Sequence, residues 1–93
     1  MSITFTQFMR PNGRRVETSI DRPEEIEQMA DALKAKGLRF EVEVLTTGHV
    51  SMAIEDKEET IAMRVVPNGP ETLKAVDELV IEASKRLKKE GSK

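Results

Sequence analysis

The feature that most constrains the fold is an alternation of apolar and polar residues between positions 38 and 55. Apolar side chains occupy the even positions of residues 38–44 and 50–54, on both sides of the tripeptide Thr46-Thr47-Gly48. A strand turns successive side chains to opposite faces of a sheet, so the alternation predicts two half-buried antiparallel strands. The tripeptide predicts a tight hairpin loop with a left-handed Gly48.

The parity of the apolar positions determines the register expected for this hairpin. Apolar residues at even positions oppose one another only if the loop has an odd number of residues. The three-residue loop satisfies this condition and pairs Val44 with Val50 on the apolar face. The same register pairs Arg39 with Glu55 on the other face, which is mostly polar.

A third strand is expected after a four-residue loop at Asp56–Glu59. Its apolar residues Ile61, Met63 and Val65 stand at odd positions, so an even-numbered loop brings them onto the apolar face of the hairpin. This register places Ile61 opposite Ile54 and commits Met63 and Val65 to the core.

The N-terminal part predicts a second hairpin, with strands at 3–10 and 14–20 joined at Pro11-Asn12-Gly13. Two rules disagree about its register. The apolar pattern pairs Phe5 with Ile20 across a two-residue Asn-Gly turn, but Pro11 then stands where the ladder needs an N–H.

Turn chemistry instead favours a three-residue loop at 11–13, with Phe8 opposite Val16. We prefer this second register, although a bulge in the first strand would reconcile the two rules. It puts Phe8 on the face opposite to Ile3, Phe5 and Met9. A two-layer monomer would leave these three exposed, so the pattern predicts a homodimer interface at Ile3, Phe5 and Met9.

Two amphipathic helices complete the pattern. The first begins at Pro23-Glu24, carries an apolar stripe over 26–33 and ends at Gly37. The second begins at Pro70-Glu71 and carries its stripe over 73–87. The predicted fold is α+β with the order ββ-α-βββ-α: a two-layer sandwich of a five-stranded antiparallel sheet with two helices on one face.

Length and composition limit the size of the protein and its chemistry. Ninety-three residues, with three phenylalanines as the only aromatic residues, predict one domain over 1–90 and a disordered tail at 91–93. The absence of cysteine excludes disulfides, thiolate nucleophiles and cysteine-ligated zinc. With no signal peptide and no apolar run of bilayer length, we expect a cytoplasmic protein.

No arrangement of side chains predicts catalysis, a metal site or a cofactor. Glu41, Glu43 and Glu55 share a face, and such carboxylates can serve acid–base chemistry or a hard metal ion. We interpret them as a solvated face that includes an Arg39–Glu55 ion pair. His49, the only histidine, is interpreted as a surface residue beside the turn.

Arg10, Arg14 and Arg15 cluster around the first turn and could bind an anion or an acidic partner surface. Nucleic-acid binding is less expected. The order α-βββ-α resembles that of double-stranded-RNA-binding domains, but the helix beginning at Pro70 lacks their lysine-rich start. The net charge of −2 also gives no general attraction to phosphate.

Four stretches of the chain, at residues 5–13, 20–23, 40–48 and 66–71, resemble a group of short uncharacterised proteins of bacteriophage and prophage genomes. The resemblance carries no site residue. It implies a phage-associated setting in the host-cell cytoplasm and an accessory role toward a host or phage protein.

The functional expectation is therefore a non-enzymatic, phage-associated accessory protein that binds another protein, as a dimeric inhibitor of a host factor or as an adaptor to one. The alternative is a small-ligand or nucleotide-binding protein that uses the three arginines of the first hairpin. A nucleic-acid-binding module is the least expected of the three.

Overall fold

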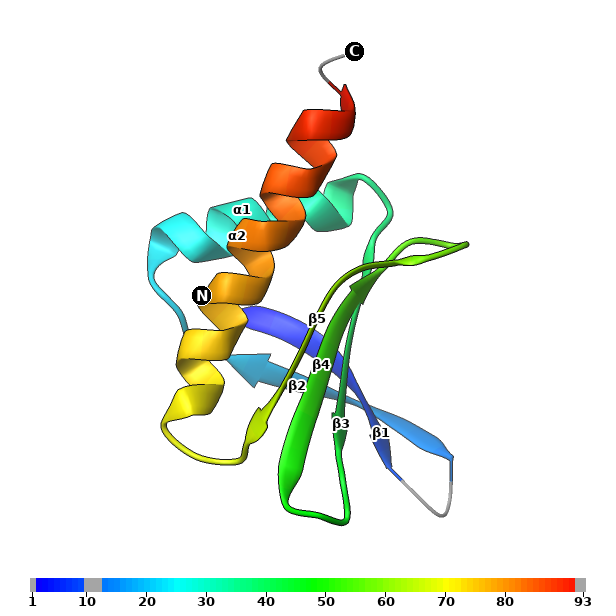
Figure 1. Cartoon of the computed structure of the whole chain (residues 1–93), viewed down its shortest axis with the longest axis vertical. Coiled ribbons are helices and arrows are strands. Elements are labelled where there is room, and N and C mark those ends of the chain that lie inside the picture. The colour runs from blue at the N-terminus through cyan, green and yellow to red at the C-terminus, as the bar shows by residue number, and fades with distance from the viewer. Residues whose placement is uncertain (1, 10–12, 92–93) are drawn as a thin grey trace.

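The computed structural model describes residues 2–9 and 13–91 (Figure 1). The strands are β1 (Ile3–Met9), β2 (Arg14–Ile20), β3 (Arg39–Val44), β4 (His49–Glu55) and β5 (Thr60–Pro67), and the helices are α1 (Glu24–Ala35) and α2 (Glu71–Gly91). The expected order ββ-α-βββ-α and the α+β class are confirmed. Gly91, expected to begin a disordered tail, is the last residue of α2.

The five strands form one sheet in the order β2-β1-β3-β4-β5. Strand β1 pairs with β2 in the antiparallel sense and with β3 in the parallel sense, so the expectation of a wholly antiparallel sheet is wrong. The strand order is the reason. Because β3 runs opposite to β2, it would be antiparallel to its neighbour if it lay beside β2, but it lies beside β1.

The central hairpin has the predicted register. Val44 opposes Val50 and Arg39 opposes Glu55, and every pair between them follows. Gly48 adopts a φ of 87°, in the left-handed region that a residue with a Cβ disfavours. The Gly48 N–H donates to the Leu45 carbonyl at 3.1 Å and closes the turn.

The first hairpin has neither of the two expected registers. Ile3 opposes Ile20 and Met9 opposes Arg14, so the connection is one residue longer than turn chemistry suggests. Gly13, at its end, has a φ of 64°, while Pro11 and Asn12 lie outside the described residues. A shift of one residue in the register changes which positions of β1 share a face with Ile20. Because the loop has one extra residue, the odd positions of β1 face the core.

This register overturns the expected exposure of the first strand. Phe5 is 0% exposed and Ile3 is 2% exposed, so both belong to the core and neither is a surface that a second copy could cover. The Phe5 ring packs against that of Phe40, with centroids 5.5 Å apart. Phe8 lies on the opposite face, and the side chain of Met9 lies outside the described residues.

The register of β5 also differs from the expected one. The four-residue loop at Asp56–Glu59 forms, with Glu55 opposite Thr60, but a bulge then shifts the register so that Ile54 opposes Ala62 rather than Ile61. An extra residue in one strand exchanges the two faces of everything after it. The bulge needs no glycine here, so the sequence carries no sign of it.

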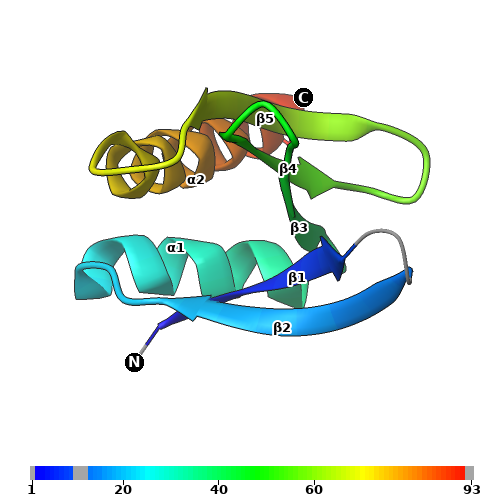
Figure 2. The ribbon, with the colours of Figure 1, turned by 90° about the horizontal axis from the view of Figure 1, so that it is seen from below.

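The core lies on the face of the sheet that the helices contact. Helix α2 packs against β4 and β5, and α1 packs against β1 and α2 (Figure 2). The largest fully buried side chains are Phe5, Met52, Ile54, Leu79, Val76 and Val80. No helix in the described part of the chain is long and apolar enough to cross a membrane.

Polar contacts connect the two helices to each other and α1 to the sheet. Arg22, just before α1, forms a two-bond ion pair with Asp77 of α2, in which the Nε atom donates to Oδ1 at 2.7 Å. Lys34 of α1 donates to the backbone carbonyl of Thr4 and lies 5.0 Å from the Phe40 ring centroid. Burial of its amine lowers the pKa of Lys34.

Glu27 of α1 is a charged residue inside this core, at 5% exposure, and its Oε1 atom has no hydrogen-bond partner among the described residues. Burying an unsatisfied polar group costs about 1–3 kcal/mol in proteins. We therefore expect Glu27→Leu to raise the free energy of unfolding by about that amount, measured by urea denaturation.

The matched control is Glu25→Leu, since Glu25 is an exposed acidic residue in the same first turn. This change should alter stability by less than about 0.5 kcal/mol. A loss of stability in the Glu27→Leu variant would contradict the expectation and indicate that the carboxylate has a partner of its own.

Candidate partner-binding face

The face of the sheet turned away from the core carries a set of side chains from four strands. The open face, as it is called below, consists of Phe8, Glu41, Glu43, Ser51, Ala53, Glu55, Met63 and Val65. Pairing across the strands brings these residues to one side of the sheet, because directly paired residues share a face.

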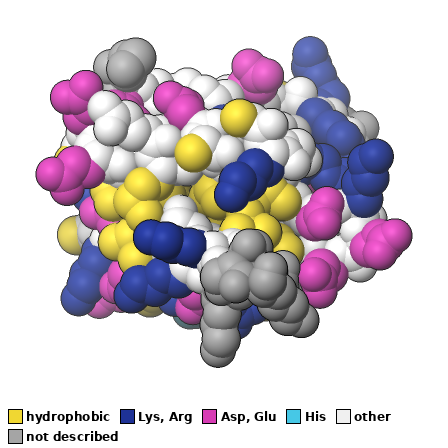
Figure 3. Space-filling view, turned by 90° about the horizontal axis from the view of Figure 1, so that it is seen from above, with side chains coloured by type: hydrophobic (Ala, Val, Ile, Leu, Met, Phe, Trp, Pro, Cys, Tyr) yellow, Lys and Arg dark blue, Asp and Glu magenta, His cyan; other side chains and the backbone are white. Residues whose placement is uncertain are grey.

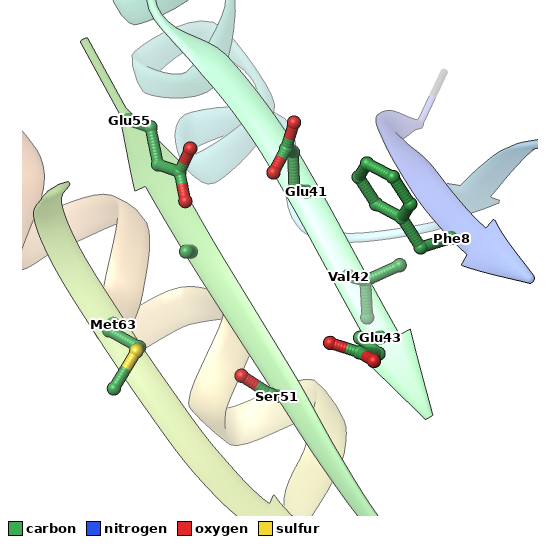
Figure 4. Close-up of a pocket in the computed structure, with 8 residues that line it drawn as sticks. Phe8, Glu41, Val42, Glu43, Ser51, Glu55 and Met63 are labelled. Atoms are coloured by element: carbon green, nitrogen blue, oxygen red, sulfur yellow. The ribbon is translucent and has the colours of Figure 1, made fainter. Parts of the chain in front are cut away.

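A shallow hollow of about 230 Å³ lies on this face. Phe8 from β1 borders it on one side and Met63 from β5 on the other, with the carboxylates of Glu41 and Glu55 between them (Figure 4). The hollow is therefore apolar at two edges and acidic in the middle.

The bulge in β5 is what makes this face apolar. With the register shifted by one residue, Met63 lies opposite Ala53 and Val65 opposite Ser51. Met63 is 55% exposed and Val65 is 49% exposed, although the alternation of β5 had predicted both for the core. Sequence reasoning missed these two residues, and it also missed Phe8.

The structure describes two of the three arginines that the sequence groups around the first turn. Arg14 and Arg15 are consecutive residues of β2, so their side chains leave opposite faces of the sheet. The guanidinium of Arg15 lies over the Phe8 ring, 4.8 Å from its centroid, which is a cation–π distance. Arg10 lies outside the described residues.

The carboxylates of the open face are spread along it. Glu55 pairs with Arg39 at 3.7 Å, the ion pair that the sequence predicts, and Arg39 is well exposed. Within the described residues no group of three or more histidines, cysteines or acidic residues could hold a metal ion. His49 is exposed, and its Nδ1 atom lies 3.0 Å from the Thr47 hydroxyl.

On the helix side of β5, Arg64 forms an ion pair with Glu82 of α2 at 2.8 Å. Arg86, one turn further along α2, lies 3.8 Å from the same carboxylate. The hydrogen bond from Arg64 holds the pKa of Glu82 below its ordinary value of 4.5, so this carboxylate is charged at neutral pH. Arg64 therefore has a counter-ion within the chain, which it shares with Arg86.

A second hollow, between the two helices, differs from the open face in charge. It is lined by Met29, Ala32, Leu33, Lys36, Ser84, Lys85 and Lys88. Figure 3 shows hydrophobic side chains gathered between the helices and bordered by basic ones. Its apolar lining is largely part of the core, whereas the open face exposes large apolar side chains.

Comparisons with protein-family models, with curated proteins and with solved structures found no match for this chain. Among the described residues, the open face holds two of the exposed large apolar side chains, Met63 and Val65, next to each other on one strand.

Proposed function

We propose that this chain is a non-enzymatic binding protein that holds another protein on its open face. In this proposal the domain has two layers, and the helices cover one face of the sheet while the other face stays free. The protein acts in a phage-associated setting in the host cytoplasm, where it inhibits a host factor or serves as an adaptor to one.

The observation that supports the proposal most strongly is the exposure of Met63 and Val65 beside Phe8 and Ala53. Single exposed apolar residues are ordinary on protein surfaces, but a face that gathers several of them is typical of interaction sites. The bulge that turns Met63 and Val65 outward forgoes their burial in the core. Contact with a partner would recover part of that burial.

Charge indicates the chemistry of the partner. The carboxylate of Glu41 stands between the apolar edges of the hollow, whereas Glu55 already pairs with Arg39. A complementary surface therefore combines apolar residues with a lysine or arginine that meets Glu41.

The proposal is tested by selection from a library of random linear peptides, with the purified protein as the target. We expect the selected peptides to be rich in lysine or arginine and in large apolar residues. Their affinity, measured by fluorescence anisotropy, should fall by about tenfold or more in a Phe8→Ser/Glu41→Lys variant, because an anchor and a charge of the face are lost.

The matched control is Leu73→Ser, which removes an exposed apolar side chain of α2 that lies away from the open face. This variant should bind the selected peptides as the wild type does. The proposal fails if the library yields no enrichment, if acidic peptides are selected, or if the Phe8→Ser/Glu41→Lys variant binds equally well.

A further inference from the structure

We infer that a second copy of this chain pairs with the outer edge of β5, joining two five-stranded sheets into one continuous sheet. The inference concerns the backbone of an edge strand rather than the open face. It goes beyond the proposed function and stands whether or not the open face binds a partner.

The hydrogen bonds at the end of β5 show which backbone groups point outward. The Asn68 N–H donates to the Gly48 carbonyl at 3.1 Å, in the same register as the rest of the β4–β5 pair. Bonded and non-bonded pairs alternate in an antiparallel ladder, so even positions of β5 bond to β4. The N–H and carbonyl groups of Met63 and Val65 therefore point away from the sheet.

Pro67 agrees with this assignment. It lies opposite His49, at an odd position of the strand. A proline has no N–H, so within a sheet it is tolerated where that group would face away from the neighbouring strand. Pro67 thus marks one limit of the stretch that can accept another strand.

Arginine side chains limit the other end. The Arg86 Nη1 atom donates to the Ile61 carbonyl at 2.7 Å, and the Arg64 Nη1 atom donates to the Met63 carbonyl at 2.9 Å. Glu82 holds both arginines. The N–H groups of Met63 and Val65 and the Val65 carbonyl keep no partner among the described residues, and the Met63 carbonyl retains a second lone pair.

This short stretch is complementary to itself. In a twofold antiparallel pair, Met63 of one copy lies opposite Val65 of the other, and the N–H of each donates to the carbonyl of the opposing residue. The side chains form apolar cross-strand pairs on the open face. Arg64 of each copy meets its equivalent at the centre, where the ion pair with Glu82 of the same chain offsets part of their repulsion.

The opposite edge of the sheet lacks this complementarity. Strand β2 exposes Arg14, Arg15 and Glu17, and charged side chains on an edge are a common protection against strand pairing. Between its two limits β5 exposes apolar side chains and free N–H groups, which is the surface that recruits another strand. A second copy supplies the matching sequence.

The test compares the masses of the wild type, Val65→Pro and Val65→Thr by light scattering at about 100 µM, where a micromolar interface is nearly saturated. The proline removes an outward N–H and leaves the ladder to β4 intact, whereas the threonine keeps the N–H. We expect dimers for the wild type and Val65→Thr, and a folded monomer for Val65→Pro with an unchanged circular dichroism spectrum.

A monomeric wild type would overturn the inference, and so would a Val65→Pro variant that remains a dimer. If Val65→Pro does not fold, the variant Met63→Lys/Val65→Lys provides the test. It places like charges opposite each other across the proposed pair, so it should be a monomer. A dimer of this variant would overturn the inference. The wild type could instead be a monomer whose selected peptides bind it but do not bind the Val65→Pro variant. That result would overturn the pairing of two copies and assign the edge of β5 to a strand of another protein.

The two proposals fail separately. Phe8→Ser/Glu41→Lys changes the open face and leaves the β5 backbone untouched, so this variant should remain a dimer. A monomeric wild type that still binds the selected peptides would separate the two proposals in the other direction. Loss of the dimer with retained peptide binding would therefore refute the strand pairing alone.

Discussion

Replacing Phe5 by alanine is expected to lower the free energy of unfolding by about 3–5 kcal/mol. The Phe5 side chain is 0% exposed and packs against the Phe40 ring. Its removal loses the transfer free energy of the ring and leaves a cavity that the neighbouring strands can only partly close. Equilibrium urea denaturation, followed by far-ultraviolet circular dichroism, measures the change.

Phe8→Ala is the matched control, because Phe8 is the same residue type three positions further along β1 and lies on the open face. Its loss should cost less than about 1 kcal/mol, mainly from the contact with Arg15. If Phe8→Ala proved the more damaging change, the faces of β1 would be the reverse of those described, and the register of the first hairpin would be wrong.

The second large effect is expected at the ion pair that joins the start of α1 to α2. Asp77→Ala should destabilise the protein by about 2 kcal/mol, less than the value for a fully buried pair because both side chains retain some exposure. Arg22 is 16% exposed and Asp77 is 25% exposed, so a lone guanidinium would be left mostly desolvated.

A double-mutant cycle isolates this effect. Arg22→Ala/Asp77→Ala should cost clearly less than the sum of the two single changes, since removing both partners leaves no uncompensated charge. Denaturation of the four proteins in urea at neutral pH supplies the comparison. Costs that simply add would show that the two residues do not interact in solution.

The parts of the fold that could be predicted are those that one rule decides. The central hairpin follows from the alternation around Gly48, because any shift by one residue would bury Glu41 and Glu43. The helices follow from apolar stripes between proline and glycine. These features are local in the sequence, and the structure reproduces them.

The parts that could not be predicted depend on non-local choices. The direction of β3 relative to its neighbour depends on which strand of the first hairpin it joins, and no local pattern encodes that. Glu27 is an acidic residue, which in α1 would ordinarily lie on the surface. Only the packing of the folded chain reveals that it is buried. Met63 is exposed because of a bulge, and no glycine or other residue pattern in the sequence marks that bulge.

For the same reason the sequence did not bring together the residues that the structure places on the open face. Arg14 and Arg15 are close in sequence but point to opposite faces, whereas Phe8 and Met63 are 55 positions apart and border one hollow. Ile3 and Phe5 were expected at an interface because a hairpin register was one residue short. An error of one residue in register exchanges a core for a surface.

The bulge beside Ile61 has a consequence for how this protein can change. Deleting one residue there would restore the regular ladder, direct Met63 and Val65 toward α2 and bring Arg64 out to the opposite side. No substitution elsewhere in β5 could exchange so many side chains at once. In β5 the number of residues, more than their identity, determines which side chains the protein exposes. We expect relatives to keep this number even where the residues themselves differ.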